Sequence, residues 1–459
     1  MPNKPQTELT DAALRRVFAG AGDFCVRAVT AAGEPATLYF IDGLTSGDAI
    51  SEYVLKPLAE HLRPAGPERV LDRALRGGIW NAVTEPCPDL ETAVQRLVNG
   101  FCVLLFEGVG ALACEVKTGE KRGVSEPETE STAKGPRDAF TETVRTNTSL
   151  LRRHLRAPEL RLYETAVGKK SRTNVCLVWL DGVTDPALVS RMKARLGEID
   201  ADGFTTPAAV EELVAGRRGT PFPLLSHTER TDRFADALLA GRVGLLVDGL
   251  PVGWLAPAEL GGLMEAAEDR ATDRLSALFV RALRYAALLV SVLLPGLYAA
   301  MAAFHQQMLP TKLLFAIIES KQSVPFPTVL EVLGLLLSFE LLQEAGLASP
   351  KAVSQPISII GGLVVGTAAV EAKLVSPAAL IVVSAAGICG FAIPGKGLAD
   401  AARLCRLGLA LAAGLAGLYG MTLASLALLT HLSALESFGH PYLAPFSSLH
   451  PGKAFSMKQ

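Results

Sequence analysis

Two stretches in the N-terminal half share one pattern: residues 25–44 read CVRAVTAAGEPATLYFIDGL, and residues 162–183 read LYETAVGKKSRTNVCLVWLDGV. Each is a short β-rich run, a polar turn and an apolar β-rich run that ends in Asp-Gly. Two later runs match likewise, GFCVLLFEG at 100–108 and GRVGLLVDG at 241–249. The offset is 139 residues between the two aspartates of the first pair and 141 between the two acids of the second. Matching patterns at matching offsets predict two related α/β subdomains.

Helical patterns follow both Asp-Gly pairs. Apolar residues recur at three- and four-residue steps in GDAISEYVLKPLAEHL (47–62) and PALVSRMKARLGEI (186–199), which predicts helices packed against one sheet in each subdomain. A polar segment rich in Pro and Gly, and then a helix at 138–155, are expected to connect the subdomains. We therefore expect a first α/β subdomain at 1–118, a linker and connecting helix at 119–158, a second α/β subdomain at 159–257, a juxtamembrane helix at 258–285, a transmembrane helical domain at 286–433 and a C-terminal tail at 434–459.

The acid-glycine pairs admit two interpretations. Carboxylates at strand ends can act as bases or metal ligands, but Asp-Gly and Glu-Gly are also common turn sequences, and we favour the turn. His61, His154 and His227 are too far apart in the sequence to form a metal-binding motif. The chain has no Walker A sequence, no GxGxxG after a strand and no GxSxG. We therefore expect neither a catalytic site nor a cofactor.

Composition separates the chain into two parts. Its 459 residues carry a formal net charge of −2, so no basic footprint for nucleic acid is present. Mean hydropathy is +0.32 although 20% of the residues are charged, because residues 1–275 are charged and mixed while residues 286–433 are apolar. This split predicts a soluble region followed by membrane spans. Seven cysteines without a CxxC pair indicate reduced thiols, and the polar N-terminus indicates no signal peptide, so we expect a cytoplasmic soluble region.

About five membrane spans can be drawn in the apolar part, at 286–304, 328–347, 356–372, 376–394 and 407–433. With the N-terminus inside, the cytoplasmic flanks carry Arg281, Arg284, Lys351, Lys396, Arg403 and Arg406. This modest excess of positive charge agrees with a cytoplasmic N-terminus. Residues 305–327 are expected to form an outer loop with an interfacial helix, or a re-entrant segment.

The second span contains three carboxylates, Glu331, Glu340 and Glu344. An ionisable side chain within a span must face protein or water, which makes it a functional candidate. Glu344 can be explained by a position at the membrane interface. Glu340, within LLLSFELL, favours a polar packing or gating role, with an interface position as the alternative.

The third span is rich in small residues. Ser358, Gly362, Gly366 and Ala369 form one helical stripe, and Gly362-LVV-Gly366 is a GxxxG motif. Such a stripe is typical of a seam between closely packed helices. It can also line a pore in a ring of subunits, with Val365 in the wall and Glu371 at the mouth favouring cations. Both interpretations predict that this span lies away from lipid.

A second polar candidate lies in the soluble region, within GTPFPLLSHTERTDRFADALLAGR at 219–242. Arg230 and Arg233 are candidates for ion pairs with a neighbouring element or subunit, and solvated surface charge is the alternative. Asp248, in the last acid-glycine pair, is a further candidate for such a contact.

Long segments of the chain resemble the spore germination receptor A-subunit family (GerA). They include FIDGL, SEPETES, KGPRDAFTETVRTNTSLLRRHL, PFPLLSHTERTDRFADALLAGRVGLLVDGLP, LRYAALLVSVLLPGLYAAM, FHQQMLPTKLL, SFGHPYLAPFSSL and most of residues 325–394, and together they extend over about residues 24–449. The resemblance implies a subunit of a germinant receptor in the spore inner membrane, acting with a transporter-like B subunit and a lipoprotein C subunit. It also implies a homo-oligomeric ring that conducts cations when nutrient binds. Gln343 and Thr367 depart from the family pattern, which often has Arg and Gln there.

Other functions fit the sequence less well. One alternative is an A-like paralogue that is associated with the SpoVA dipicolinate channel and amplifies germination. The genes that neighbour this one would distinguish it from a receptor subunit. A secondary transporter would favour inverted repeats in the membrane part, whereas the repeat lies in the soluble part. An enzyme is the weakest alternative because no catalytic motif is present.

Overall fold

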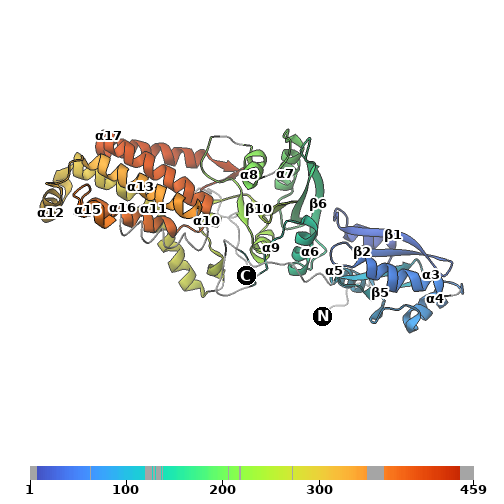
Figure 1. Ribbon diagram of the computed structural model, residues 1–459. Coiled ribbons are helices and arrows are strands. Elements are labelled where there is room, and N and C mark those ends of the chain that lie inside the picture. Colours follow the sequence, from blue (N-terminus) through green and yellow to red (C-terminus); the bar gives the residue numbers. More distant parts are fainter. Residues whose placement is uncertain are drawn as a thin grey trace. The chain divides into compact units, whose positions relative to one another are not determined.

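The structure is a computed structural model that describes residues 8–62, 64–118, 127, 130, 136, 138–204, 206–216, 219–270, 272–348 and 366–444. These residues divide into two compact units. The α/β unit contains residues 8–216 and 225–257, and the helical unit contains residues 219–224 and 258–444, with the gaps given above. Figure 1 shows sheets in the first and long helices in the second.

The first part of the α/β unit is a five-stranded antiparallel sheet with strand order β1-β2-β4-β5-β3. Its strands are β1 (Phe24–Ala31), β2 (Glu34–Ile41), β3 (Thr84–Cys87), β4 (Phe101–Phe106) and β5 (Gly110–Glu115). The helical segments are α1 (Asp11–Val17), α2 (Gly47–Ala49), a π-helical turn at Ile50–Leu55, α3 (Lys56–Glu60), α4 (Pro67–Arg73), a second π-helical turn at Ala74–Gly78 and α5 (Leu90–Val98).

The second part repeats this topology with strand order β6-β7-β9-β10-β8. Its strands are β6 (Leu160–Val167), β7 (Thr173–Leu180), β8 (Ser226–Thr228), β9 (Val243–Val247) and β10 (Gly253–Ala256). Its helices are α6 (Val144–His154), α7 (Pro186–Glu198), α8 (Pro207–Ala215) and α9 (Thr231–Leu239). Both sheets join their first, second, fourth, fifth and third strands in that order, so the predicted α/β character is confirmed and the repeat appears as one topology used twice.

Alternation along the strands buries both faces of the first sheet. Leu38 and Leu104 face a core that also contains Val54 and Leu58, whereas the neighbouring residue Tyr39 faces a second core with α1 and α5. A strand buried on both faces reads as a continuous apolar run. This explains FCVLLF at β4, in which every residue is buried.

The acid-glycine pairs form turns, as predicted. Gly43, Gly108, Gly182 and Gly249 each follow a strand with φ between 72° and 87°. This left-handed conformation is the one that glycine adopts without steric cost.

The helical unit consists mainly of four long helices, α11 (Arg274–Ala303), α13 (Thr328–Ala348), α16 (Pro377–Phe391) and α17 (Lys396–Ala434). Shorter elements are α10 (Leu260–Leu263), 3-10 turns at Ala267–Arg270 and Gln306–Met308, α12 (Thr311–Lys321), α15 (Gly366–Glu371), β11 (Glu436–Ser437) and β12 (His440–Pro441). Small residues let α11 and α17 approach closely, because a Cβ at Gly296 would lie 3.2 Å from the Leu409 carbonyl oxygen.

Two of the described helices, α11 and α17, are long and apolar enough to cross a membrane, and α16 is apolar but shorter. At 30 residues α11 extends about 45 Å, more than the ~30 Å hydrocarbon layer. Helix α13 occupies the second predicted span but carries three glutamates. Of the third predicted span, only residues 366–372 lie within the described residues. The expectation of about five spans is therefore not confirmed, since two helices in the described part of the chain have the length and apolar composition of a span.

The last predicted span begins at residue 407, with Arg403 and Arg406 in its cytoplasmic flank, whereas α17 begins at Lys396 and contains both arginines. Arg406 is only 2% exposed. The helix is interrupted at Ala416 and Gly417, whose backbone angles are not helical. Hydropathy alone ends a span at a charge, whereas a charge with a partner on another helix can lie within the bundle.

Candidate functional site

Four helices of the helical unit meet at the guanidinium of Arg406 on α17. Its Nη2 donates to the Glu340 carboxylate on α13. Its Nη1 lies 3.4 Å from the Ser291 hydroxyl on α11 and 3.4 Å from the Ala386 carbonyl on α16. The two 3.4 Å contacts are long for hydrogen bonds, so the ion pair with Glu340 is the main partner of this buried charge.

Arg403 places a second cation beside the same carboxylate. Its Nε lies 3.6 Å from the second Glu340 oxygen, and its Nη1 lies 3.3 Å from Asp400 one turn earlier. Residues three apart on a helix share a face, so α17 presents both arginines to Glu340. We call Ser291, Glu340, Arg403 and Arg406 the buried arginine cluster.

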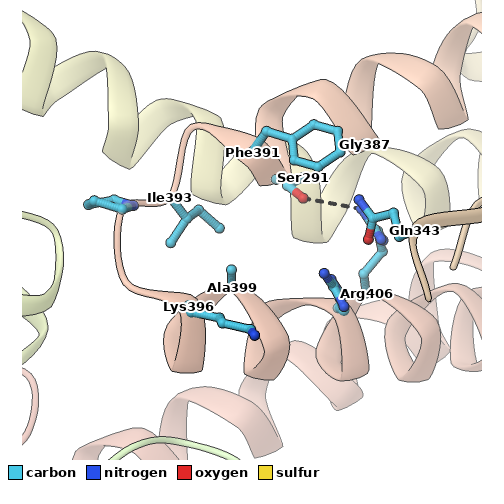
Figure 2. Close-up of a pocket in the computed structure, with 11 residues that line it drawn as sticks. Ser291, Gln343, Gly387, Phe391, Ile393, Lys396, Ala399 and Arg406 are labelled. Atoms are coloured by element: carbon cyan, nitrogen blue, oxygen red, sulfur yellow. Dashed lines mark hydrogen bonds between the residues drawn. The ribbon is translucent and has the colours of Figure 1, made fainter. Parts of the chain in front are cut away.

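A cavity of about 220 Å³ adjoins this cluster. Arg406 and Gln343 lie at one end of it and Ile393 at the other (Figure 2). Arg406 Nε and Gln343 Oε1 are buried, and neither has a hydrogen-bond partner among the described residues. Buried polar atoms are normally paired, so two unpaired atoms beside a cavity indicate space for a polar ligand or water.

Glu331 forms a separate polar contact near the other end of α13. Its carboxylate is 2% exposed and accepts a hydrogen bond from the backbone N–H of Ser376 at the start of α16. Lys321 Nζ on α12 lies 3.7 Å away. A carboxylate is favoured at a helix N-terminus because the free N–H groups point toward it. Glu331 and Glu340 thus both contact other helices, whereas Glu344 is exposed.

The stripe of small residues is described only in part. Gly366 is buried on α15, where a Cβ would lie 3.5 Å from Leu380, while Ala369 is half-buried and Glu371 is exposed. Ser358, Gly362 and Val365 lie outside the described residues. The choice between a pore wall and a packing seam therefore stays a prediction.

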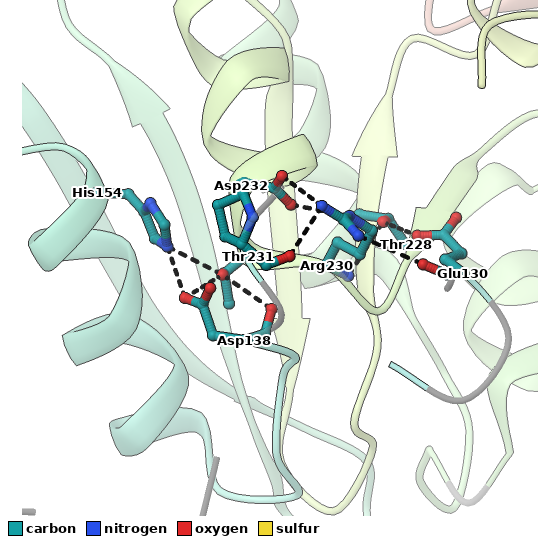
Figure 3. Close-up of polar contacts among 8 residues, drawn as sticks. Glu130, Asp138, His154, Thr228, Arg230, Thr231 and Asp232 are labelled. Carbon is teal, nitrogen blue, oxygen red and sulfur yellow. Dashed lines mark hydrogen bonds and ion pairs between the residues drawn. The ribbon is translucent and has the colours of Figure 1, made fainter. Parts of the chain in front are cut away.

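Within the α/β unit, Arg230 is not solvated surface charge, because it is 2% exposed. Its Nη2 lies 2.6 Å from Asp232 Oδ2 and 3.1 Å from the Pro136 carbonyl oxygen (Figure 3). Arg233 Nη1 lies 2.6 Å from Glu130 Oε1. Both arginines therefore bind linker residues of their own chain.

A contact that the sequence did not predict joins Asp138, His154 and Thr231. His154 Nε2 and Thr231 Oγ1 each lie 2.7 Å from Asp138 Oδ2 (Figure 3). The hydrogen bond with His154 lowers the pKa of Asp138 to about 2, and the same bond raises the pKa of His154. The helix expected at 138–155 is shorter in the structure, because α6 begins at Val144, and Asp138 lies before it.

Asp248 caps the connecting helix. Its Oδ1 accepts from the Val144 N–H, the first residue of α6, at 3.0 Å. The equivalent acid of the first repeat, Glu107, accepts from the N–H of Asp11, the first residue of α1, at 3.3 Å. Helix caps of this kind satisfy N–H groups that have no partner within the helix. The repeat therefore extends to the helix before each sheet.

A buried ion pair joins the two sheets of the α/β unit. Arg152 on α6 and Asp23 before β1 are 1% and 2% exposed. The guanidinium donates to the carboxylate through Nε at 2.7 Å and Nη2 at 2.8 Å, and it also donates to the carbonyl oxygens of Ala157 and Leu160. Such two-point pairs fix orientation as well as distance, so this pair links α6 to the loop before β1 with a defined geometry.

No group of three or more acids, histidines or cysteines suited to a metal ion occurs among the described residues. The contacts above are ion pairs, hydrogen bonds and helix caps between elements.

Comparison with known proteins identifies the family. Residues 12–458 match the family described as Bacillus/Clostridium GerA spore germination protein. The chain belongs to this family. Three relatives come from Bacillus subtilis (strain 168). Uncharacterized membrane protein YfkQ is 36% identical over 89% of this chain and 80% of its own length. Spore germination protein KA is 35% identical over 89% of this chain and 76% of its own length. Spore germination protein B1 is 33% identical over 92% of this chain and 86% of its own length.

A solved structure also shows similarity, the N-terminal domain of the A subunit of the Bacillus megaterium spore germinant receptor GerK3. It is 22% identical and covers 56% of this chain and 98% of its own, with a TM-score of 0.43.

Proposed function

We propose that this chain is a membrane subunit of a spore germinant receptor, a receptor component without enzymatic activity. The observation that carries the proposal is the family match over residues 12–458, which includes both units. Two relatives that match over 76% and 86% of their own length are named spore germination proteins. Two membrane-length helices in the described part of the chain support the membrane location.

In this proposal the helical unit crosses the spore inner membrane several times, and the α/β unit lies in the cytoplasm. The five spans are α11, α13, the segment 356–372, α16 and α17. The ion pair between Glu340 and Arg406 supports the inclusion of α13, because a paired charge can lie among helices where an unpaired one would be expelled. Glu331 is likewise held by α12 and α16.

The subunits then assemble into a homo-oligomeric ring with a transporter-like B subunit and a lipoprotein C subunit. Nutrient binding opens a path for cations through this ring. The stripe of Ser358, Gly362, Val365, Gly366 and Ala369 lines the path, and the exposed Glu371 attracts cations at its mouth.

The test is ion flux through purified protein reconstituted into vesicles with its B subunit, with and without candidate amino acids. The Gly362→Leu and Gly366→Leu variants are expected to abolish or deregulate potassium efflux, because the larger side chain narrows the cation path. Gly408→Leu on α17 is the matched control, because open space surrounds Gly408. Unchanged nutrient-dependent efflux in bulky variants at all the stripe positions would exclude the pore.

A further inference from the structure

The cavity beside the buried arginine cluster is lined by three cations of one helix. Lys396, Arg403 and Arg406 follow each other at steps of seven and three residues along α17, and all three line the cavity. These steps keep the three side chains on one side of the helix. The cavity wall is therefore strongly basic.

The acids nearby do not neutralise this wall. Glu340 and Asp400 are the carboxylates that form ion pairs with the two arginines. Within the described residues, Lys396 has no ion-pair partner and Glu344 pairs with none of the three cations. Three positive charges thus face two negative ones.

The buried part of the cavity wall also contains a hydrogen-bond donor that is available to a ligand. Arg406 is 2% exposed and lines the cavity, and in the part of the chain that the structure describes its Nε–H has no hydrogen-bond partner. Helix α17 begins at the same place, since Lys396 and Ala399 of its first turn line the cavity. The first N–H groups of a helix have no acceptor within the helix and favour an anion.

An exposed apolar strip leads away from the cavity along α16. Phe391 lines the cavity and is 67% exposed. Ile388 and Ile381, three and ten residues earlier, are each 68% exposed. These spacings place the three side chains on one face of the helix, so a basic cavity and a long apolar strip adjoin one another.

We propose that this cavity binds the phosphate of an anionic phospholipid, with an acyl chain lying along Ile381, Ile388 and Phe391. A basic pocket between membrane helices is a recognised way to hold a lipid headgroup. The apolar strip favours a lipid over a free phosphate ion, which would need only the cations. The proposal rests on the membrane location of the helical unit, and it does not require that the protein conduct ions.

Purified full-length protein in nanodiscs provides the test. The discs contain phosphatidylcholine with a small fraction of fluorescent phosphatidylglycerol, and enrichment of the anionic lipid at the protein is measured by energy transfer from a fluorophore on α17. Lys396→Gln is the first variant, since Lys396 is exposed and unpaired and its loss leaves the fold intact. We expect roughly five-fold weaker enrichment for Lys396→Gln and a further loss for Lys396→Gln with Arg403→Gln. Lys312→Gln, which removes an exposed lysine outside the cavity, is expected to change nothing.

Two further arms separate the possible ligands. The Ile388→Asp variant is expected to weaken lipid enrichment, although it leaves every cation of the cavity in place. Inorganic phosphate at millimolar concentration is expected not to displace the lipid. Equal enrichment in the wild type and the Lys396→Gln variant would overturn the proposal, as would displacement by phosphate alone. Ion flux is measured on the same variants, so that the lipid proposal and the receptor proposal can fail separately. If a variant loses its lipid preference and keeps nutrient-dependent flux, the receptor proposal still holds.

Discussion

Removal of either charge of the Glu340–Arg406 pair tests whether this contact holds the helices together. Glu340→Gln removes the counter-charge of the buried Arg406 guanidinium, which then has only neutral acceptors: the new amide oxygen and the long contacts to Ser291 and Ala386. Arg406→Gln leaves Glu340 partly compensated, because Arg403 lies 3.6 Å from its second oxygen. The structure therefore predicts unequal effects from the two halves of one ion pair.

The expected magnitudes follow from the cost of leaving a buried charge without its partner. We expect Glu340→Gln to lower the free energy of unfolding by about 3 to 5 kcal/mol and Arg406→Gln by about 2 kcal/mol. The double variant contains no unpaired buried charge, so its cost is expected to be no greater than that of Glu340→Gln alone. The resulting coupling energy is about 2 kcal/mol, well above the ~0.5 kcal/mol seen for independent sites.

The assay is equilibrium unfolding of full-length protein in detergent micelles by increasing amounts of sodium dodecyl sulfate. Glu344→Gln provides the control, since it removes the same charge from the same helix one turn further on, at an exposed position. Its expected effect is within about 0.5 kcal/mol. The ion pair does not hold the helices together if the losses of unfolding free energy in the two single variants add up in the double variant, or if Glu344→Gln loses more than Glu340→Gln.

The α/β unit allows three independent tests by thermal unfolding. Asp138 raises the pKa of His154, so the contact contributes its full stability below pH 6.5, the pKa of an unfolded histidine, and this stability is lost as the pH rises through the folded pKa. In the His154→Gln variant the melting temperature should no longer decline over this pH range. The same pH profile in the variant and the wild type would contradict this expectation. Gly244→Ala should lower the free energy of unfolding by about 1 to 3 kcal/mol, because its Cβ would lie 2.1 Å from a ring carbon of Phe234. Gly197→Ala lies in a helix with open space around it and should be neutral or stabilising by up to ~1 kcal/mol. A larger loss of stability for Gly197→Ala than for Gly244→Ala would be inconsistent with this packing. Asp23→Asn should cost about 3 kcal/mol because it leaves a buried guanidinium without its counter-charge; a loss below 1 kcal/mol would mean that the ion pair does not join the sheets.

Local patterns in the sequence predicted much of the fold. Strand-turn-strand runs that end in an acid and glycine predicted both sheets, since the turn residue and the alternation are local properties. Apolar periodicity and length likewise predicted α13 and α16 near their observed bounds, whereas α11 and α17 begin 12 and 11 residues before the predicted spans. Most of the segment 356–372, with the stripe, lies outside the described residues, so its role stays a prediction.

Contacts between distant residues were not predictable in the same way. The local pattern of the sequence marks Arg406 as a flanking charge, because its partner, Glu340, lies 66 residues earlier on another helix. The available signal is the presence of acids in one apolar segment and of bases beside another. The Asp138–His154–Thr231 contact likewise joins residues as far as 93 positions apart, so no local pattern indicates it.

The most direct test of the receptor proposal is the current through a planar bilayer that contains this protein and its B subunit, with a potassium chloride gradient across it. We expect a cation-selective current that rises when the nutrient is added, and a reversal potential that moves toward zero in the Glu371→Gln variant as the cation preference weakens. Absence of any nutrient-dependent current, or an anion-selective current that Glu371→Gln leaves unchanged, would contradict it.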